Sequence, residues 1–366
     1  MSLTTSSTSA EPVRPSSKAS IDRIVDLESF SEYSSEKIAT DAAACESAGA
    51  GGFWSVERLH DPFLPLAYAS TTTRTIDLGT SITIALSRSP MTVAYSAHDL
   101  QALTGGRFIL GLGPQHQSHL ANRFSMPADR PLGRMREYVG ALRAIWDCWN
   151  TKRPLNFRGR FYTHTLMPPF VCPPPNPYGP PRIFMAAVGP KMAELAGEIA
   201  DGVIAPPFAT ARHLSEVLVP AVERGLTKSG RTRDEFTIMG VPMTVMGDSV
   251  DDRETAAAKA RLQLALHSSP ADARAVFDLH GLGHLGERVT EIFISGTGDQ
   301  PRQMQDLVTD EILDIFTLIG RHDEVLEKAQ KRFAGIADRI APVIYTAEPD
   351  DGAALTSALR ASRLAN

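Results

Sequence analysis

The chain alternates between short β-branched apolar runs and stretches with helical spacing, and this alternation constrains its fold most. The expected strands are 21–27, 52–56, 76–86, 107–113, 182–188, 202–206, 236–246 and 315–319. The helical patterns are 35–49, 64–73, 91–103, 134–149, 191–200, 211–229, 251–266 and 323–336. Such alternation favours a parallel sheet covered by helices. Eight units in order therefore predict an α/β fold, the (β/α)₈ or TIM barrel.

Two segments interrupt the alternation and are interpreted as insertions after strands 4 and 7. The first, 151–181, is rich in proline and aromatic residues and is expected to contain a small hairpin over 155–162. The second is 267–314. An open doubly wound sheet is the alternative fold, and it usually has a glycine-rich dinucleotide loop after an early strand. The run Gly111-Leu112-Gly113 comes late and has no third glycine, so the barrel is favoured.

The 366 residues are expected to form one barrel domain over 20–344, with a disordered tail at 1–19 and a C-terminal tail or short surface helix at 345–366. The first tail lacks the continuous apolar stretch of a secretory signal, and no apolar run is long enough for a bilayer. A net charge of −5 argues against a general nucleic-acid partner. Three cysteines without paired spacing favour a reduced, cytoplasmic setting and give no zinc signature.

Catalytic groups of such barrels lie at the C-terminal ends of the strands. After the second expected strand, four ionisable residues lie within five positions: Glu57, Arg58, His60 and Asp61. Such a cluster can supply proton transfer and bind anions. The structural alternative is a solvated loop that Asp-Pro closes.

The third and fourth expected strands both carry glycine near their ends. Gly79 and its small polar neighbours indicate a bulge or a close backbone approach, against which a flat ring system could lie. The alternative is a barrel strand with small inward residues. Gly111 and Gly113 would admit a ligand close to the backbone. His116 follows them and is a candidate proton donor.

The fifth expected strand ends in Gly189-Pro190, where a helix begins. Proline suits the first helical position. The free amides and the dipole at the helix start attract an anion, and Lys191 adds positive charge. Late loops of barrels often bind phosphate. A well-capped helix with an exposed lysine is an equally weighted alternative.

Taken together, these segments resemble the luciferase-like monooxygenase superfamily over about 35–339, and within it an actinobacterial-type, deazaflavin-dependent subgroup. The Gly-Gly-Arg-Phe and Ala-Asp-Gly blocks are typical of the superfamily. The Asp-Pro-Phe-Leu-Pro and Arg-Phe-Ser-Met-Pro blocks are typical of the subgroup. The segments that carry the resemblance are 57–66, 78–80, 88–91, 99–103, 105–113, 123–127 and 187–202.

The resemblance implies an oxidoreductase that carries a flavin-type cofactor, coenzyme F420 or alternatively FMN. The leading hypothesis is hydride transfer between F420 and a small organic substrate. An FMNH₂-dependent monooxygenase that uses O₂ and a non-catalytic deazaflavin-binding barrel are the alternatives. The family also implies a homodimer. The net charge and the lack of a long apolar run predict neither nucleic acid nor membrane as a partner.

The resemblance further implies a bulge in the third strand with a non-prolyl cis peptide at Ser81-Ile82, and a phosphate site around 188–192. The catalytic candidates are Glu57, Arg58, His60 and His116. No metal site is expected. The residues expected to bind the cofactor are Thr80, Ser81, Ile82, Gly113, Gln115, Ala187, Val188, Gly189, Pro190, Lys191 and Met192.

Three positions depart from the better-known relatives. Arg58 stands where many members have histidine after an acidic residue, and His116 stands where deazaflavin-dependent sugar-phosphate dehydrogenases have an acidic residue. Both changes argue against a sugar phosphate as substrate. An arginine can instead bind an anionic substrate or the acidic cofactor tail, and proton transfer then falls to His116, Glu57 or His60. The segment 267–270 lacks the subgroup's aromatic residue before Ser-Thr-Pro.

Overall fold

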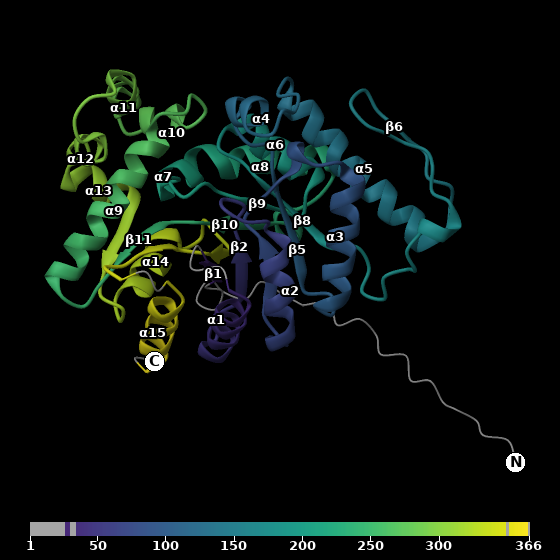
Figure 1. Ribbon diagram of the computed structural model, residues 1–366, viewed down its shortest axis with the longest axis horizontal. Coiled ribbons are helices and arrows are strands. Elements are labelled where there is room, and N and C mark those ends of the chain that lie inside the picture. Colours follow the sequence, from purple (N-terminus) through teal and green to yellow (C-terminus); the bar gives the residue numbers. More distant parts are fainter. Residues whose placement is uncertain (1–25, 30–33, 349–350, 365–366) are drawn as a thin grey trace, which may run out of the picture.

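Parallel strands curl around the centre of the molecule, and helices surround them (Figure 1). This computed structural model describes residues 26–29, 34–348 and 351–364. The main sheet has the order β1-β2-β3-β5-β8-β9-β10-β13, and β1 packs against β14, which follows β13 along the chain. The strands are β1 Asp26–Ser29, β2 Gly52–Ser55, β3 Asp77–Thr80, β4 Thr83–Ile84, β5 Phe108–Gly113, β8 Arg182–Ala186, β9 Gly202–Ile204, β10 Thr237–Gly240, β13 Arg339–Ile340 and β14 Val343–Tyr345. The predicted barrel is confirmed.

The outer helices begin and end close to the predicted positions. In α1, the Ser34 side chain accepts a hydrogen bond from the Lys37 amide, and Gly49 ends the helix with φ 88°. Capping by serine and left-handed glycine is how sequence signals a helix start and stop. The helices are α1 Ser35–Ala48, α2 Phe63–Thr72, α3 Pro90–Leu103, α5 Pro131–Thr151, α6 Pro190–Ile199, α7 Ala211–His213, α8 Val219–Ser229 and α14 Val325–Phe333.

The prediction that 315–319 forms the last strand of the barrel is wrong. Residues 315–319 overlap β12 (Thr317–Gly320), which pairs only with β11 (Met243–Met246), outside the main sheet. The predicted strand 236–246 breaks into β10 and β11 at Pro242, which has no amide hydrogen to donate. The eighth barrel position belongs to β13 and β14. A second proline, Pro342, splits this strand into two short pieces, which hid it in the sequence.

The C-terminal stretch contains α15 (Asp351–Leu364), which follows the eighth strand and packs against α1. Leu355 is fully buried there. The predicted tail or surface helix is thus a packed helix.

The two insertions lie at different sides of the barrel (Figure 1). The first, 151–181, follows α4 Gln117–Asn122 and α5 along the chain and contains the antiparallel pair β6 Phe157–Arg158 and β7 Thr163–His164. The predicted hairpin is therefore present, with its second strand two residues further along than 155–162. The second insertion, 267–314, begins at the end of α9 Val250–Ser268 and contains α10 Arg274–Asp278, α11 His284–Ser295, α12 Gln300–Asp306 and the first part of α13 Asp310–Phe316. Throughout the described ranges, every helix is too short or too polar to span a membrane.

Buried side chains pack in two places, inside the barrel and under the second insertion. Inside the barrel, Trp54 and Phe184 stack with ring centroids 6.1 Å apart. Under the second insertion, Phe208 from the loop after β9 packs against Phe277 of α10. Each such large buried side chain contributes roughly 1.5–3 kcal/mol. The second insertion is thereby attached to the strand ends of the barrel.

Candidate active site

The third barrel strand is interrupted by a bulge at the predicted place. Gly79 pairs with Ile109 and Thr83 pairs with Leu112, so four steps on one strand face three on the other. The Ser81-Ile82 peptide bond is cis, as the resemblance implied. The Ser81 amide donates to the Ser55 carbonyl at 2.8 Å, which ties the bulge to β2.

Thr80 and two glycines make this bulge possible. The Thr80 hydroxyl donates to the Gly111 carbonyl at 2.8 Å and accepts from the Gly111 amide at 3.0 Å, in place of ladder bonds. A Cβ on Gly111 would lie 1.8 Å from the Thr80 carbonyl oxygen, and a Cβ on Gly113 would lie 2.7 Å from Ile82 Cδ1. The glycines were predicted to admit a ligand. In the structure they first make room for the bulge.

Glu57 lies just after the end of β2, and other groups of the protein already bind its carboxylate oxygens. The Arg88 Nη1 donates to its two carboxylate oxygens at 2.6 and 2.7 Å, and the Ile84 amide donates at 2.7 Å. Arg88 Nη2 also donates to Asp61 at 3.1 Å. The Glu57 side chain is only 6% exposed. Glu57 therefore anchors the backbone after the bulge, a role that its position in the sequence did not reveal.

A buried tyrosine adjoins this ion pair. Tyr138 of α5 is fully buried, and its hydroxyl has no hydrogen-bond partner among the described residues. Burial raises the pKa of Tyr138 well above its usual range, whereas the charge of Arg88 acts to lower it and that of Glu57 to raise it. Tyr138 therefore stays neutral.

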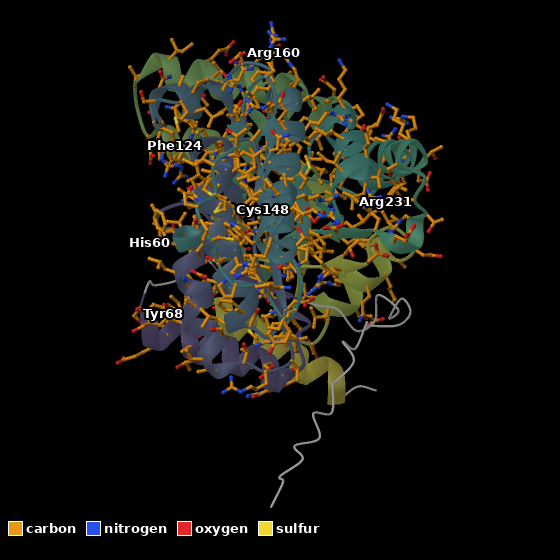
Figure 2. All side chains as sticks on the ribbon, turned by 90° about the vertical axis from the view of Figure 1, so that its right-hand side faces the viewer. His60, Tyr68, Phe124, Cys148, Arg160 and Arg231 are labelled. Carbon is orange, nitrogen blue, oxygen red and sulfur yellow. The ribbon has the colours of Figure 1, made fainter. Side chains whose placement is uncertain are left out.

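The other two candidates after β2 are exposed. The Arg58 carbonyl accepts from Arg123 Nη2 at 2.9 Å, which joins this loop to α4. The His60 side chain is exposed, and Figure 2 shows it at the edge of the molecule. Both residues are accessible to a ligand in solution.

His116 lies just beyond β5, and an acidic residue of the second insertion holds it. His116 Nδ1 lies 3.0 Å from Asp272 Oδ1, and the two side chains are 39% and 55% exposed. The hydrogen bond to Asp272 raises the pKa of His116, against the opposing effect of burial. Burial favours a higher pKa of Asp272, but the bond and charge of His116 together with the backbone amides of Asp272 and Ala273 outweigh it and lower that pKa. No sequence signal connected these residues, which are far apart in the chain.

His267 of α9 completes this part of the site. Burial, followed by the positive charges of Arg58 and His116, lowers the pKa of His267 to about 4. Its ring lies 5.1 Å from that of Phe208. His267 is therefore neutral near pH 7. The loops after β2 and β5 and the second insertion thus meet at one place.

The start of α6 follows β8 as predicted. Gly189 is the N-cap, Pro190 takes the first turn, and no side chain caps the helix. Among the residues that the structure describes, a Cβ on Gly189 would meet no atom within 4 Å, and Lys191 is exposed. The amides at this helix start are therefore open to an anion.

A buried histidine lies behind the start of α6. His213 is 1% exposed, and the backbone of Val188 acts to raise its pKa. Burial lowers the pKa of His213 to about 4. Its Nδ1 has no hydrogen-bond partner within the part of the chain that the structure describes. His213 therefore supports the strand end as a neutral ring.

Residues 29–339 match the family model of the luciferase-like monooxygenases, so the chain belongs to this family. The chain is thus a luciferase-like oxidoreductase. An uncharacterized protein of Mycobacterium tuberculosis is 43% identical over 315 residues, which are 85% of this chain and 91% of that protein. The 5,10-methylenetetrahydromethanopterin reductase of Archaeoglobus fulgidus is 30% identical and covers 70% of this chain and 73% of its own.

A solved structure shares the fold of this chain. The coenzyme F420 dependent tetrahydromethanopterin reductase of Methanopyrus kandleri superposes with a TM-score of 0.76 at 20% identity. The match covers 95% of this chain and 99% of the reductase. At this identity the likeness shows the barrel fold alone.

Proposed function

We propose that this chain is a coenzyme F420-dependent oxidoreductase that transfers hydride between the deazaflavin and a small organic substrate. Two features carry the proposal. The first is the bulge with the cis peptide Ser81-Ile82 near the end of the third barrel strand, and the second is the start of α6, which no side chain of the described residues caps. A flat ring with a phosphate-bearing tail fits these two features. The F420 dependence of the structurally similar Methanopyrus reductase supports the choice of cofactor.

The residues divide into those that hold the ligand and one that moves a proton. Ser81 and Ile82 would support the ring, and the amides of Lys191 and Met192 would bind phosphate. When bound, a deazaflavin supplies or accepts a hydride. Reduction of a polarised double bond also needs a proton at the heteroatom, and we assign its delivery to His116. The reverse reaction returns the proton to the same imidazole.

An FMN-dependent monooxygenase is the second candidate, because the family itself is named for monooxygenases. The same bulge and helix start would accept the FMN ring and phosphate. The two functions differ in cofactor and in the use of O₂.

The test is a titration of the purified protein with coenzyme F420 and, separately, with FMN, followed by spectra on reduction and by an oxygen electrode. We expect saturable F420 binding and no oxygen consumption. Lys191→Ala should weaken F420 binding about tenfold, equivalent to about 1.4 kcal/mol. Lys331→Ala, an exposed lysine of α14, is the matched control and should leave affinity unchanged. FMN binding without F420 binding would overturn the proposal.

A further inference from the structure

One contact joins the loop after β5 to the second insertion beside the strand ends. It is the 3.0 Å contact between His116 Nδ1 and Asp272 Oδ1. The helices that follow these residues, α4 and α10, lie at the same end of the molecule (Figure 1). Surface ion pairs contribute only about 0–1 kcal/mol to stability. A gain in stability therefore does not explain why Asp272 faces His116, the proposed proton donor.

We propose that Asp272 is the positioning residue for His116, and that it fixes the ring tautomer with the hydrogen on Nδ1. This inference rests on the proposed function, in which His116 exchanges a proton with the substrate. When Nδ1 donates to Asp272, Nε2 is the ring nitrogen left for proton exchange. Such a carboxylate also fixes the ring orientation, as in catalytic triads.

The Asp272 carboxylate lies in the turn before α10. In this turn the Ala273 amide donates to the Pro270 carbonyl at 3.0 Å. The backbone amides of Asp272 and Ala273 also help to lower the pKa of Asp272. The turn thus places the carboxylate where it faces the His116 ring.

The charged and titratable groups around His116 come from three elements. His119 on α4 has its ring centroid 6.2 Å away, and His267 on α9 is held neutral. Arg58, from the loop after β2, acts on His267 together with His116. Burial is what opposes the charged form of His116. Asp272 supplies the opposing negative charge.

The pair also makes stability depend on pH in one direction. The pairing raises the pKa of His116 above its unfolded value of about 6.5. Its contribution to stability is therefore fully present below about pH 6.5 and is lost as pH rises through the folded pKa. Asp272→Asn should remove this part of the pH dependence.

The test is nitrogen NMR of the histidine rings in the ¹⁵N-labelled full chain, with His116→Gln to assign the His116 signals. In the wild type at high pH, we expect the neutral ring to carry its hydrogen on Nδ1. In Asp272→Asn, the His116 midpoint should fall by about one pH unit, a tenfold loss of proton affinity. Asp272→Glu should restore it, and Asp306→Asn, an exposed aspartate of α12, should leave it unchanged.

A wild-type His116 with its hydrogen on Nε2 would overturn the inference, even if Asp272→Asn fails to fold. An unchanged midpoint in a folded Asp272→Asn, checked by circular dichroism, would also overturn it. The titration with coenzyme F420 separates this result from the proposed function. Wild-type protein that fails to bind F420 would contradict the cofactor assignment. The NMR measurement of the His116 ring would still test the role of Asp272.

Discussion

At the scale of single residues, Glu57 shows how a partner decides a role. A carboxylate after a barrel strand predicts acid–base chemistry, and Glu57 does lie at that strand end. Arg88 and the Ile84 amide instead occupy its oxygens. A buried charge that loses its partner is costly, so this pair holds the bulge in place.

Replacing Arg88 should therefore lower the free energy of unfolding. We expect Arg88→Met to cost about 3 kcal/mol, because Glu57 is left buried without its cation. Urea denaturation measures the change. Arg321→Met breaks an ion pair whose side chains are both 53% exposed and should leave the free energy of unfolding nearly unchanged. Equal losses in the two variants would contradict the anchoring role.

At the scale of elements, the third and fourth barrel strands are shaped for each other. The extra residue of the bulge pushes backbone toward β5, and the Thr80 hydroxyl replaces the lost ladder bonds. Gly111 and Gly113 have no side chain, so they leave room for this backbone. The start of α6 is open for a different reason, because a Cβ on Gly189 would meet no atom of the described residues within 4 Å.

Two alanine substitutions distinguish a glycine that packing requires, Gly111, from one with open space beside it, Gly189. Gly111→Ala places a Cβ on the Thr80 carbonyl, which is backbone and cannot swing away, so we expect more than about 3 kcal/mol of destabilisation. Gly189 has φ −95° and ψ 161°, which any residue adopts, so Gly189→Ala should keep its thermal stability. We expect Gly189→Ala to bind F420 more weakly, since the new methyl faces the proposed phosphate site. Calorimetry measures both effects, and a stable Gly111→Ala would argue against this packing.

At the scale of the whole molecule, the barrel closes through segments that the sequence seemed to leave outside it. β14 contacts β1, and α15 packs on α1, so the two ends of the described chain meet. Cytoplasmic location and a homodimer stay predictions from the sequence and the family.

The closing helix should carry a measurable share of stability. Leu355 of α15 is fully buried, and we expect Leu355→Ala to cost about 2–4 kcal/mol through lost contacts and a cavity. Leu103, at the end of α3, is 61% exposed, and Leu103→Ala should change stability by less than about 0.5 kcal/mol. Denaturant unfolding compares the two. A small loss at Leu355 would mean that α15 is dispensable.

The sequence by itself determined the barrel, most helix boundaries, the bulge and the open helix start. These are local features, because hydrophobic period, caps, glycine and proline act on their own neighbours. It also put His116 at a strand end. Only the tertiary structure decided that Glu57 is engaged, that Asp272 faces His116, and that residues 339–345 complete the barrel. Each of these depends on segments far apart in the chain, and a partner brought in by folding leaves no periodic trace in the sequence.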